Sequence, residues 1–184
     1  MATRQGFGSA LHLVTRFFGS LIPFGPRADD EKWALEHLST KERLLFSSMS
    51  GADRRHAVAV AKEALRLARR DGVNEASLPA GFLPAALLHD VGKLESGLGT
   101  FGRVFATFAA LGLGRSKVVS WAPAGGWRGR FAAYLTHDAI GARLLEGAGS
   151  EGFTVTWTRQ HHLPPERWEI DAKLASFLKD ADGD

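Results

Sequence analysis

The chain of 184 residues has the length of a single domain. It contains no cysteine, which excludes disulfide bonds and metal sites built from thiolates. The formal net charge of +3 is too small to indicate nucleic acid as a partner. A cytoplasmic location is compatible with this composition, and we expect one.

The excess positive charge lies in residues 1–27, which contain Arg4, Arg16 and Arg27 and no acidic residue. The stretch "GFGSALHLVTRFFGSLIPFGP" is apolar, but His12 and several glycines interrupt it too often for a bilayer-spanning helix. It also lacks the cleavage pattern of a secretory signal. We expect an amphipathic helix or arm that packs on the domain, and weak contact with a membrane surface or a partner is the alternative.

The rest of the chain has a helical pattern nearly throughout, so the predicted fold class is all-α. Ser39 and Glu42 form a capping-box pattern, Asp53 is a plausible N-cap, and Gly72 is a plausible helix stop. The β-branched residues of 153–162 also allow a short strand, although we favour a helix there. The predicted helices cover 29–38, 39–49, 53–72, 77–94, 102–114, 131–150, 153–162 and 164–184, and residues 122–130 are predicted to form a loop.

Several of these helices carry a histidine or an aspartate on an otherwise apolar face. One such histidine is most simply explained as a hydrogen-bonded core residue. Several that converge without partners would each cost several kcal/mol, roughly, in desolvation. A divalent metal ion would remove that cost by binding neutral imidazole and carboxylate together. Nitrogen and oxygen ligands without sulfur suit iron, manganese, cobalt, nickel or zinc. The candidates are His56, His89, Asp90, His137, His161 and Asp182.

The order and spacing of these residues resemble a known family. His56, then His89-Asp90 in "HDVGK", and a late aspartate resemble the H…HD…D signature of the HD-domain metal-dependent phosphohydrolases. The segments "HDAIGARLL" and "RQHHLPPERW" resemble the H-x-x-x-G and HH segments of two-metal members, which include the HD-GYP proteins. The resemblance implies an HD-type helical bundle over residues 51–184. Residues 1–50 would form the basic, amphipathic N-terminal segment and the leading helices.

The resemblance also implies a ligand set. One metal ion would be held by His56, His89, Asp90 and Asp182, and Asp90 would bridge to a second ion at His137 and His161. Asp180 competes with Asp182 for the terminal position, and a solvated acidic tail is the alternative for both. His162 could be a ligand, a donor to a ligand or a substrate contact.

By the same resemblance, the expected reaction is hydrolysis of a nucleotide or another small phosphoester. Asp90 would set the positions of the metal ions, and Lys93 would contact the phosphate or instead form a salt bridge with a carboxylate. Arg54 and Arg55 could bind an anionic substrate, or they could be exposed or paired with nearby acids. The glycine-tyrosine-proline element of the HD-GYP proteins is absent after His162, so cyclic di-GMP is not the expected substrate.

Two other functions remain open at this point. Some HD proteins are di-iron oxygenases with ligands of the same kind, and a non-catalytic regulatory module could keep a metal site for structural reasons. The segment from Leu94 to Thr136 adds a helix that could cap a pocket or fill out the core. The sequence names neither the substrate nor the metal.

Overall fold

The computed structural model describes residues 24–183, and these residues form helices and connecting turns with no strand. The predicted all-α class is confirmed. The segment predicted for residues 1–27 lies almost entirely outside the described residues. Within them, no helix combines the length and the apolar content needed to cross a membrane.

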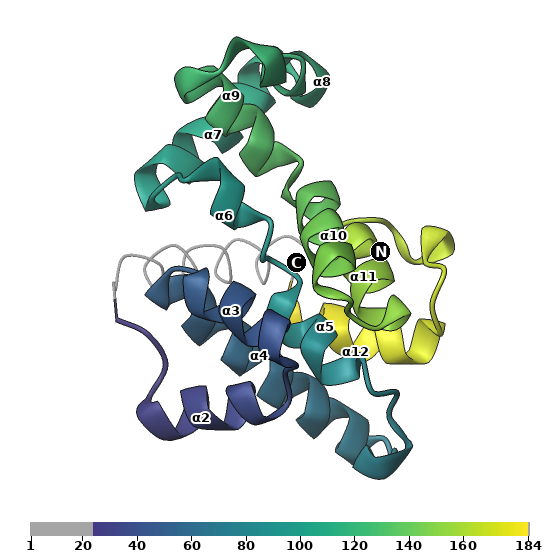
Figure 1. Cartoon of the computed structure of the whole chain (residues 1–184). Helices are drawn as coiled ribbons and strands as arrows, with labels where there is room; N and C mark the ends of the chain where they lie inside the picture. The colour runs from purple at the N-terminus through teal and green to yellow at the C-terminus, as the bar shows by residue number, and fades with distance from the viewer. Residues whose placement is uncertain (1–23, 184) are drawn as a thin grey trace, which may run out of the picture.

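Figure 1 shows a larger body with a smaller lobe above it. The body contains α2 (Ala28–Glu36), α3 (Thr40–Ser48), α4 (Gly51–Arg70), α5 (Phe82–Leu88), α10 (His137–Ala148), α11 (Gly152–Gln160) and α12 (Ala172–Asp182), with the 3-10 turns Glu75–Ser77 and Pro165–Arg167. The short helix α6 (Lys93–Ser96) leads into the lobe. The lobe, residues 100–135, contains α7 (Thr100–Leu113), α8 (Arg115–Val119), the 3-10 turn Ala122–Ala124 and α9 (Gly126–Leu135).

The body is built around α4, which packs against α12 and α5, while α11 packs against α5 and α10. The alanines and leucines of α4 and α5 form one apolar core with Trp157 and Leu178. Ala34 of α2 and Phe46 of α3 belong to the same core. The leading helices from residue 28 onward are therefore joined to the following helices by shared packing.

Local sequence signals fix several helix ends. The predicted capping box is present, because the Glu42 N–H donates to the Ser39 hydroxyl and the Ser39 N–H donates to the Glu42 carboxylate. Gly72 follows the end of α4 with a φ of 77°, which a glycine adopts without strain. The predicted N-cap of α4 is wrong: Ser50 caps the helix, and its hydroxyl accepts the N–H of Asp53. Because Ser50 lies three positions before Asp53, the helix begins earlier than predicted, at Gly51.

Other predicted boundaries also differ from the structure. The helix expected over 77–94 is two helices, α5 and α6, and it starts only at Phe82. The helix expected over 131–150 is two helices that break at Thr136, where φ is −118°. The loop expected over 122–130 already contains the first turns of α9. The last helix starts at Ala172 rather than near 164, because the Asp171 side chain caps it by accepting the Leu174 N–H. The strand alternative for 153–162 is wrong, since residues 152–160 form α11.

Candidate metal centre

Side chains from five segments meet where the C-terminal end of α5 faces α4, α10, α11 and the end of α12. Five of them are almost fully buried, although they are histidines and aspartates, and His56 of α4 is partly exposed. The exposed fractions are 2% for His89, 3% for Asp90, 7% for His137, 1% for His161 and 4% for Asp182. Burial of this degree requires that each group be paired or bound to an ion.

The buried histidines share one orientation. The Nδ1–H groups of His89, His137 and His161 donate to the backbone carbonyls of Ala86, Tyr134 and Thr158, at 2.9, 2.7 and 2.8 Å. Each acceptor lies three residues earlier, at the end of the preceding helix. These bonds hold the proton of each Nδ1 and direct each Nε2 atom away from the backbone, as in histidines that bind metals.

Asp90 lies at the centre of the cluster. One carboxylate oxygen, Oδ1, is 3.2 Å from Nε2 of His137. The other, Oδ2, is 3.5 Å from Nε2 of His89 and 2.5 Å from the ammonium nitrogen of Lys93. A single carboxylate therefore contacts histidines from α10 and from the α5 end. The salt bridge considered for Lys93 is present, and its partner is Asp90.

Two sets of potential ligand atoms flank this carboxylate. The ligand atoms of His56, His89 and Asp90 lie within 4.8 Å of one another, and so do those of His137, His161 and His162. Asp182 joins the first set, because its Oδ1 is 2.9 Å from Nε2 of His56 and 3.6 Å from Nε2 of His89.

The structure thus brings together all six residues predicted as ligands. Asp182 is buried in the cluster, whereas Asp180 is exposed on the outer face of α12. His162 is exposed at the edge, and its Nε2 lies 3.2 Å from Nε2 of His137.

The residues present fit a bound metal ion. The Nε2 atoms of His89 and His161 are buried and make no hydrogen bond within the described residues. The two rings lie 5.4 Å apart between centroids, so both unsatisfied nitrogens belong to one small region. Leaving two such nitrogens unpaired is costly, and a divalent ion bound by imidazole would satisfy them.

The charges of the cluster are strongly coupled. Burial alone would raise the pKa of Asp90, but Lys93 and His89 hold it well below its usual range. Burial also opposes the charge on His89, yet Asp90 and Asp182 raise the pKa of His89 to about 9. Burial and the neighbouring histidines hold the pKa of His161 well below its usual range. At neutral pH His161 is therefore ready to bind a metal, whereas His89 must first lose a proton.

Two glycines allow the two halves of the cluster to meet. A Cβ atom on Gly92 would lie 1.9 Å from the carbonyl oxygen of His137 and 2.5 Å from the backbone N of Gly141. A Cβ on Gly141 would lie 3.1 Å from the backbone N of Gly92. The turn after Asp90 and the first turns of α10 are thus in direct backbone contact. This contact gives a physical reason for glycine in both "HDVGK" and "HDAIGARLL".

Two neighbours of the cluster were not singled out from the sequence. Arg103 of α7 forms a bidentate ion pair with Asp53 of α4, at 2.6 and 2.7 Å. Tyr134 stacks on His137, with ring centroids 5.9 Å apart. Tyr134 is the single tyrosine of the chain and lies one turn before His137, which is the only signal the sequence offered.

The arginines expected to bind substrate make other contacts. Arg54 pairs with Glu31 at 3.0 Å and donates to the carbonyls of Ser47 and Met49, so it ties α2 and the end of α3 to α4. Arg55 donates to the carbonyl of Phe24. Their role toward a substrate stays a prediction.

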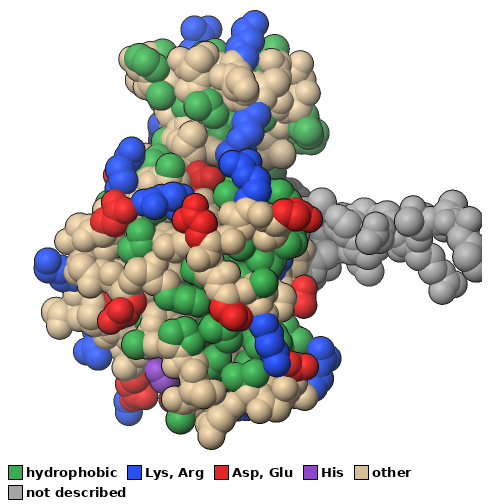
Figure 2. Space-filling model, turned by 90° about the vertical axis from the view of Figure 1, so that its right-hand side faces the viewer, with side chains coloured by type: hydrophobic (Ala, Val, Ile, Leu, Met, Phe, Trp, Pro, Cys, Tyr) green, Lys and Arg blue, Asp and Glu red, His purple; other side chains and the backbone are tan. Residues whose placement is uncertain are grey.

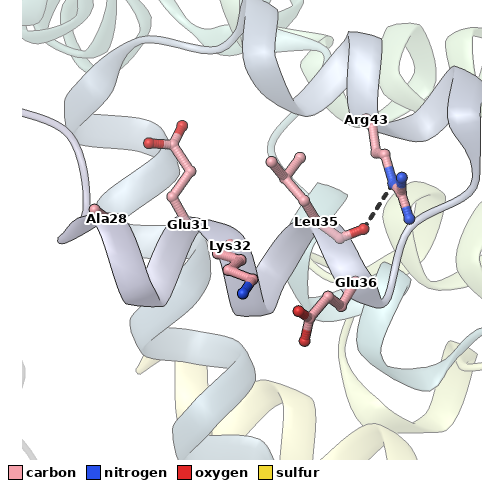
Figure 3. Close-up of a pocket in the computed structure, with 6 residues that line it drawn as sticks. All are labelled: Ala28, Glu31, Lys32, Leu35, Glu36 and Arg43. Atoms are coloured by element: carbon pink, nitrogen blue, oxygen red, sulfur yellow. Dashed lines mark hydrogen bonds between the residues drawn. The ribbon is translucent and has the colours of Figure 1, made fainter.

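A separate surface hollow of about 480 Å³ lies between α2 and α3 (Figure 3). Arg43 lies at one end of it, donating to the Leu35 carbonyl at 2.7 Å, and the Glu31 and Glu36 carboxylates point in opposite directions from α2. None of the candidate ligands lines this hollow. Its lining residues are Ala28, Glu31, Lys32, Leu35, Glu36 and Arg43.

Comparisons of this chain with protein-family models, with curated proteins and with solved structures gave no match.

Proposed function

We propose that this protein is a metal-dependent phosphohydrolase of the HD type that acts on a nucleotide or another small phosphoester. The observation that carries the proposal is the position of Asp90, whose two oxygens face histidines of two different ligand sets. A carboxylate placed in this way is the arrangement needed to bridge two metal ions in a hydrolase.

The metal ions would be held by the four histidines and two aspartates of the buried cluster, with His162 at its exposed edge. When bound, divalent ions supply Lewis acidity toward phosphoryl oxygens and lower the pKa of water. Imidazole and carboxylate without thiolate favour iron, manganese, cobalt, nickel or zinc.

The remaining residues of the site suit an anionic substrate. The Lys93 side chain is 13% exposed and stays charged: burial lowers its pKa, but Asp90, Tyr134 and Asp53 together raise it above its ordinary value. It therefore presents a positive charge next to the central carboxylate. His162 is exposed beside His137, where a ring N–H can donate to a phosphate oxygen.

Metal content and hydrolysis test this proposal together. Protein prepared without chelators should contain transition metal, and it should release phosphate from mononucleotides or simple phosphomonoesters when manganese, iron, cobalt or nickel is added. Asp90→Asn should abolish turnover, because the amide cannot bridge two ions. Asp138→Asn is the matched control: its carboxylate lies at the start of α10, accepts the Ala139 N–H and belongs to neither ligand set.

The outcomes separate three functions. Turnover that survives Asp90→Asn contradicts the mechanism. Dioxygen uptake by the iron-loaded protein, without release from any phosphoester, would indicate an oxygenase. Tightly bound metal with neither activity would indicate a structural or regulatory site.

A further inference from the structure

We propose that the lobe formed by α7, α8 and α9 docks onto an anionic lipid surface through the exposed apolar face of α7. This inference concerns residues 100–135 and is independent of the metal centre.

The apolar face of α7 is exposed among the described residues. Phe101, Phe105 and Phe108 recur at intervals of four and three, so they form one stripe along the helix. Their exposed fractions are 66%, 63% and 65%. Ala106 lies on the opposite side of the helix and is fully buried against the rest of the lobe. The large aromatic side chains therefore point outward, and the small one packs inward.

Exposed apolar side chains are concentrated on this lobe. Leu111, Leu113 and Trp127 add to the phenylalanines, with exposed fractions of 76%, 50% and 57%. Among the described residues, the only other large hydrophobic side chains that are exposed are Phe24 and Leu44. A patch of this kind on a folded protein marks an interaction surface.

The positive charge of the lobe favours an anionic partner. Residues 100–135 contain no aspartate or glutamate, and Arg103 is the one base among them that pairs with an acid of the body, Asp53. Figure 2 shows blue and green side chains on the upper lobe, whereas red ones begin below it on this face. The exposed bases are Arg115, Lys117, Arg128 and Arg130. Basic residues combined with exposed phenylalanine, leucine and tryptophan are typical of segments that lie in a lipid headgroup region.

The tryptophans before α9 and in its first turn strengthen this assignment. Trp121 and Trp127 lie 5.7 Å apart between ring centroids, and the guanidinium of Arg128 lies 5.6 and 5.2 Å from them. Tryptophan beside arginine is suited to the boundary between water and lipid, where the ring is half-buried and the cation meets phosphate.

Two other occupants are disfavoured by charge. A second copy of the lobe would bring the same positive charge to the interface. Residues 1–23 contain Arg4 and Arg16 and no acid, so they offer no opposite charge either. An anionic surface complements both the charge and the apolar stripe.

Vesicle binding tests the proposal on the full chain. Co-sedimentation would compare vesicles of phosphatidylcholine alone with vesicles that contain about one third phosphatidylglycerol. The wild type should bind the anionic vesicles at least about tenfold more tightly, and about 1 M salt should weaken binding because it shortens the Debye length to about 3 Å. The triple variant Phe101→Ser, Phe105→Ser, Phe108→Ser should lose about tenfold or more in binding. A Lys117→Ser, Arg128→Ser variant should show a similar loss on anionic vesicles only.

Matched controls lie on the body. Leu44→Ser removes a leucine that is 67% exposed on α3, and Lys41→Ser with Arg70→Ser removes two exposed bases. Neither control should change vesicle binding, and unchanged circular dichroism should show that every variant is folded.

Several outcomes would overturn the proposal. Equal binding of the wild type to neutral and anionic vesicles would do so. So would a lobe variant that turns a dimer into a monomer without changing vesicle binding, or binding of single-stranded oligonucleotides in place of vesicles. Loss of vesicle binding in the Phe17→Ser, Phe18→Ser variant, without a loss in the α7 variant, would indicate that the N-terminal segment and not the lobe contacts the lipid.

Discussion

At the scale of single residues, two opposing effects act on His89 of the candidate centre: burial lowers its pKa and two carboxylates raise it. His89 is buried between Asp90 and Asp182, and these carboxylates hold a proton on it at neutral pH even though burial opposes the charge. A metal ion and this proton compete for the same Nε2 atom. Metal binding must therefore release a proton.

This competition predicts that metal affinity rises with pH. Below a pKa of about 9, His89 carries the proton that the metal displaces, so affinity should increase by roughly tenfold per pH unit between about pH 6 and 8. Competition titrations against a chelator at pH 6, 7 and 8 would measure this, after correction for the chelator's own protonation. Calorimetry in two buffers of different ionisation enthalpy should show about one proton released per ion. Affinity that is independent of pH would mean that His89 is neutral or is not a ligand.

The second prediction separates the two ligand sets. His137→Gln should lower bound metal by about one equivalent and reduce hydrolysis, because His137 faces Asp90 from α10 and heads the second set. His37→Gln is the control, since His37 packs on Trp33 at the end of α2 and lies outside both sets. Full metal content in His137→Gln would indicate that one ion occupies the cluster and that this histidine is structural.

At the scale of elements, the sequence was a good guide to which residues are helical and a poorer guide to where helices bend. Capping chemistry is local, so the Ser39–Glu42 box could be read directly. The break at Thr136 could not be predicted, because residues 131–150 keep a continuous helical pattern. His137, the first residue after the break, contacts Asp90. The order of the candidate ligands could also be predicted from the sequence. The three Nδ1 hydrogen bonds that orient the histidines could not, because they depend on where the preceding helices end.

The glycine contact between α6 and α10 gives the third prediction. Gly92→Ala should destabilise the protein by several kcal/mol or prevent folding, because the new methyl group would meet backbone atoms that cannot move aside. Gly147→Ala within α10 is the matched control, since a Cβ there meets nothing within 4 Å, and it should be neutral or slightly stabilising. Urea unfolding of the two variants measures the difference. Equal stability would show that the turn after Asp90 and α10 are not in contact.

At the scale of the whole molecule, the body and the lobe are joined by polar contacts as well as by chain connectivity. The Asp53–Arg103 ion pair links α4 to α7, and its two side chains are only 11% and 19% exposed. Arg130 of α9 donates to the carbonyls of Ser96 and Gly97, which joins the lobe to α6. Asp53 lies one turn before His56 on α4, and Lys93, the first residue of α6, lies three residues after Asp90. The contacts that hold the lobe are therefore next to residues of the candidate metal centre.

The Asp53–Arg103 ion pair predicts that the packing of the lobe on the body becomes less stable at acid pH. Burial would raise the pKa of Asp53, but Arg103, Lys93 and Ser50 together hold it below its ordinary value of 3.8. A carboxylate with a lowered pKa contributes stability that is complete above about pH 4 and is lost as the pH falls through the folded-state pKa. Asp53→Asn should therefore cost on the order of 3 kcal/mol at pH 7, because it leaves the largely covered Arg103 guanidinium without its carboxylate, and it should flatten the acid dependence of unfolding. Hydrogen–deuterium exchange at pH 7 should become faster in α7 than in α10.

The control for this prediction is Glu63→Gln, which breaks an exposed pair with Arg66 on the same helix and should change stability little. Unchanged exchange in α7 of Asp53→Asn would mean that apolar packing alone holds the lobe on the body.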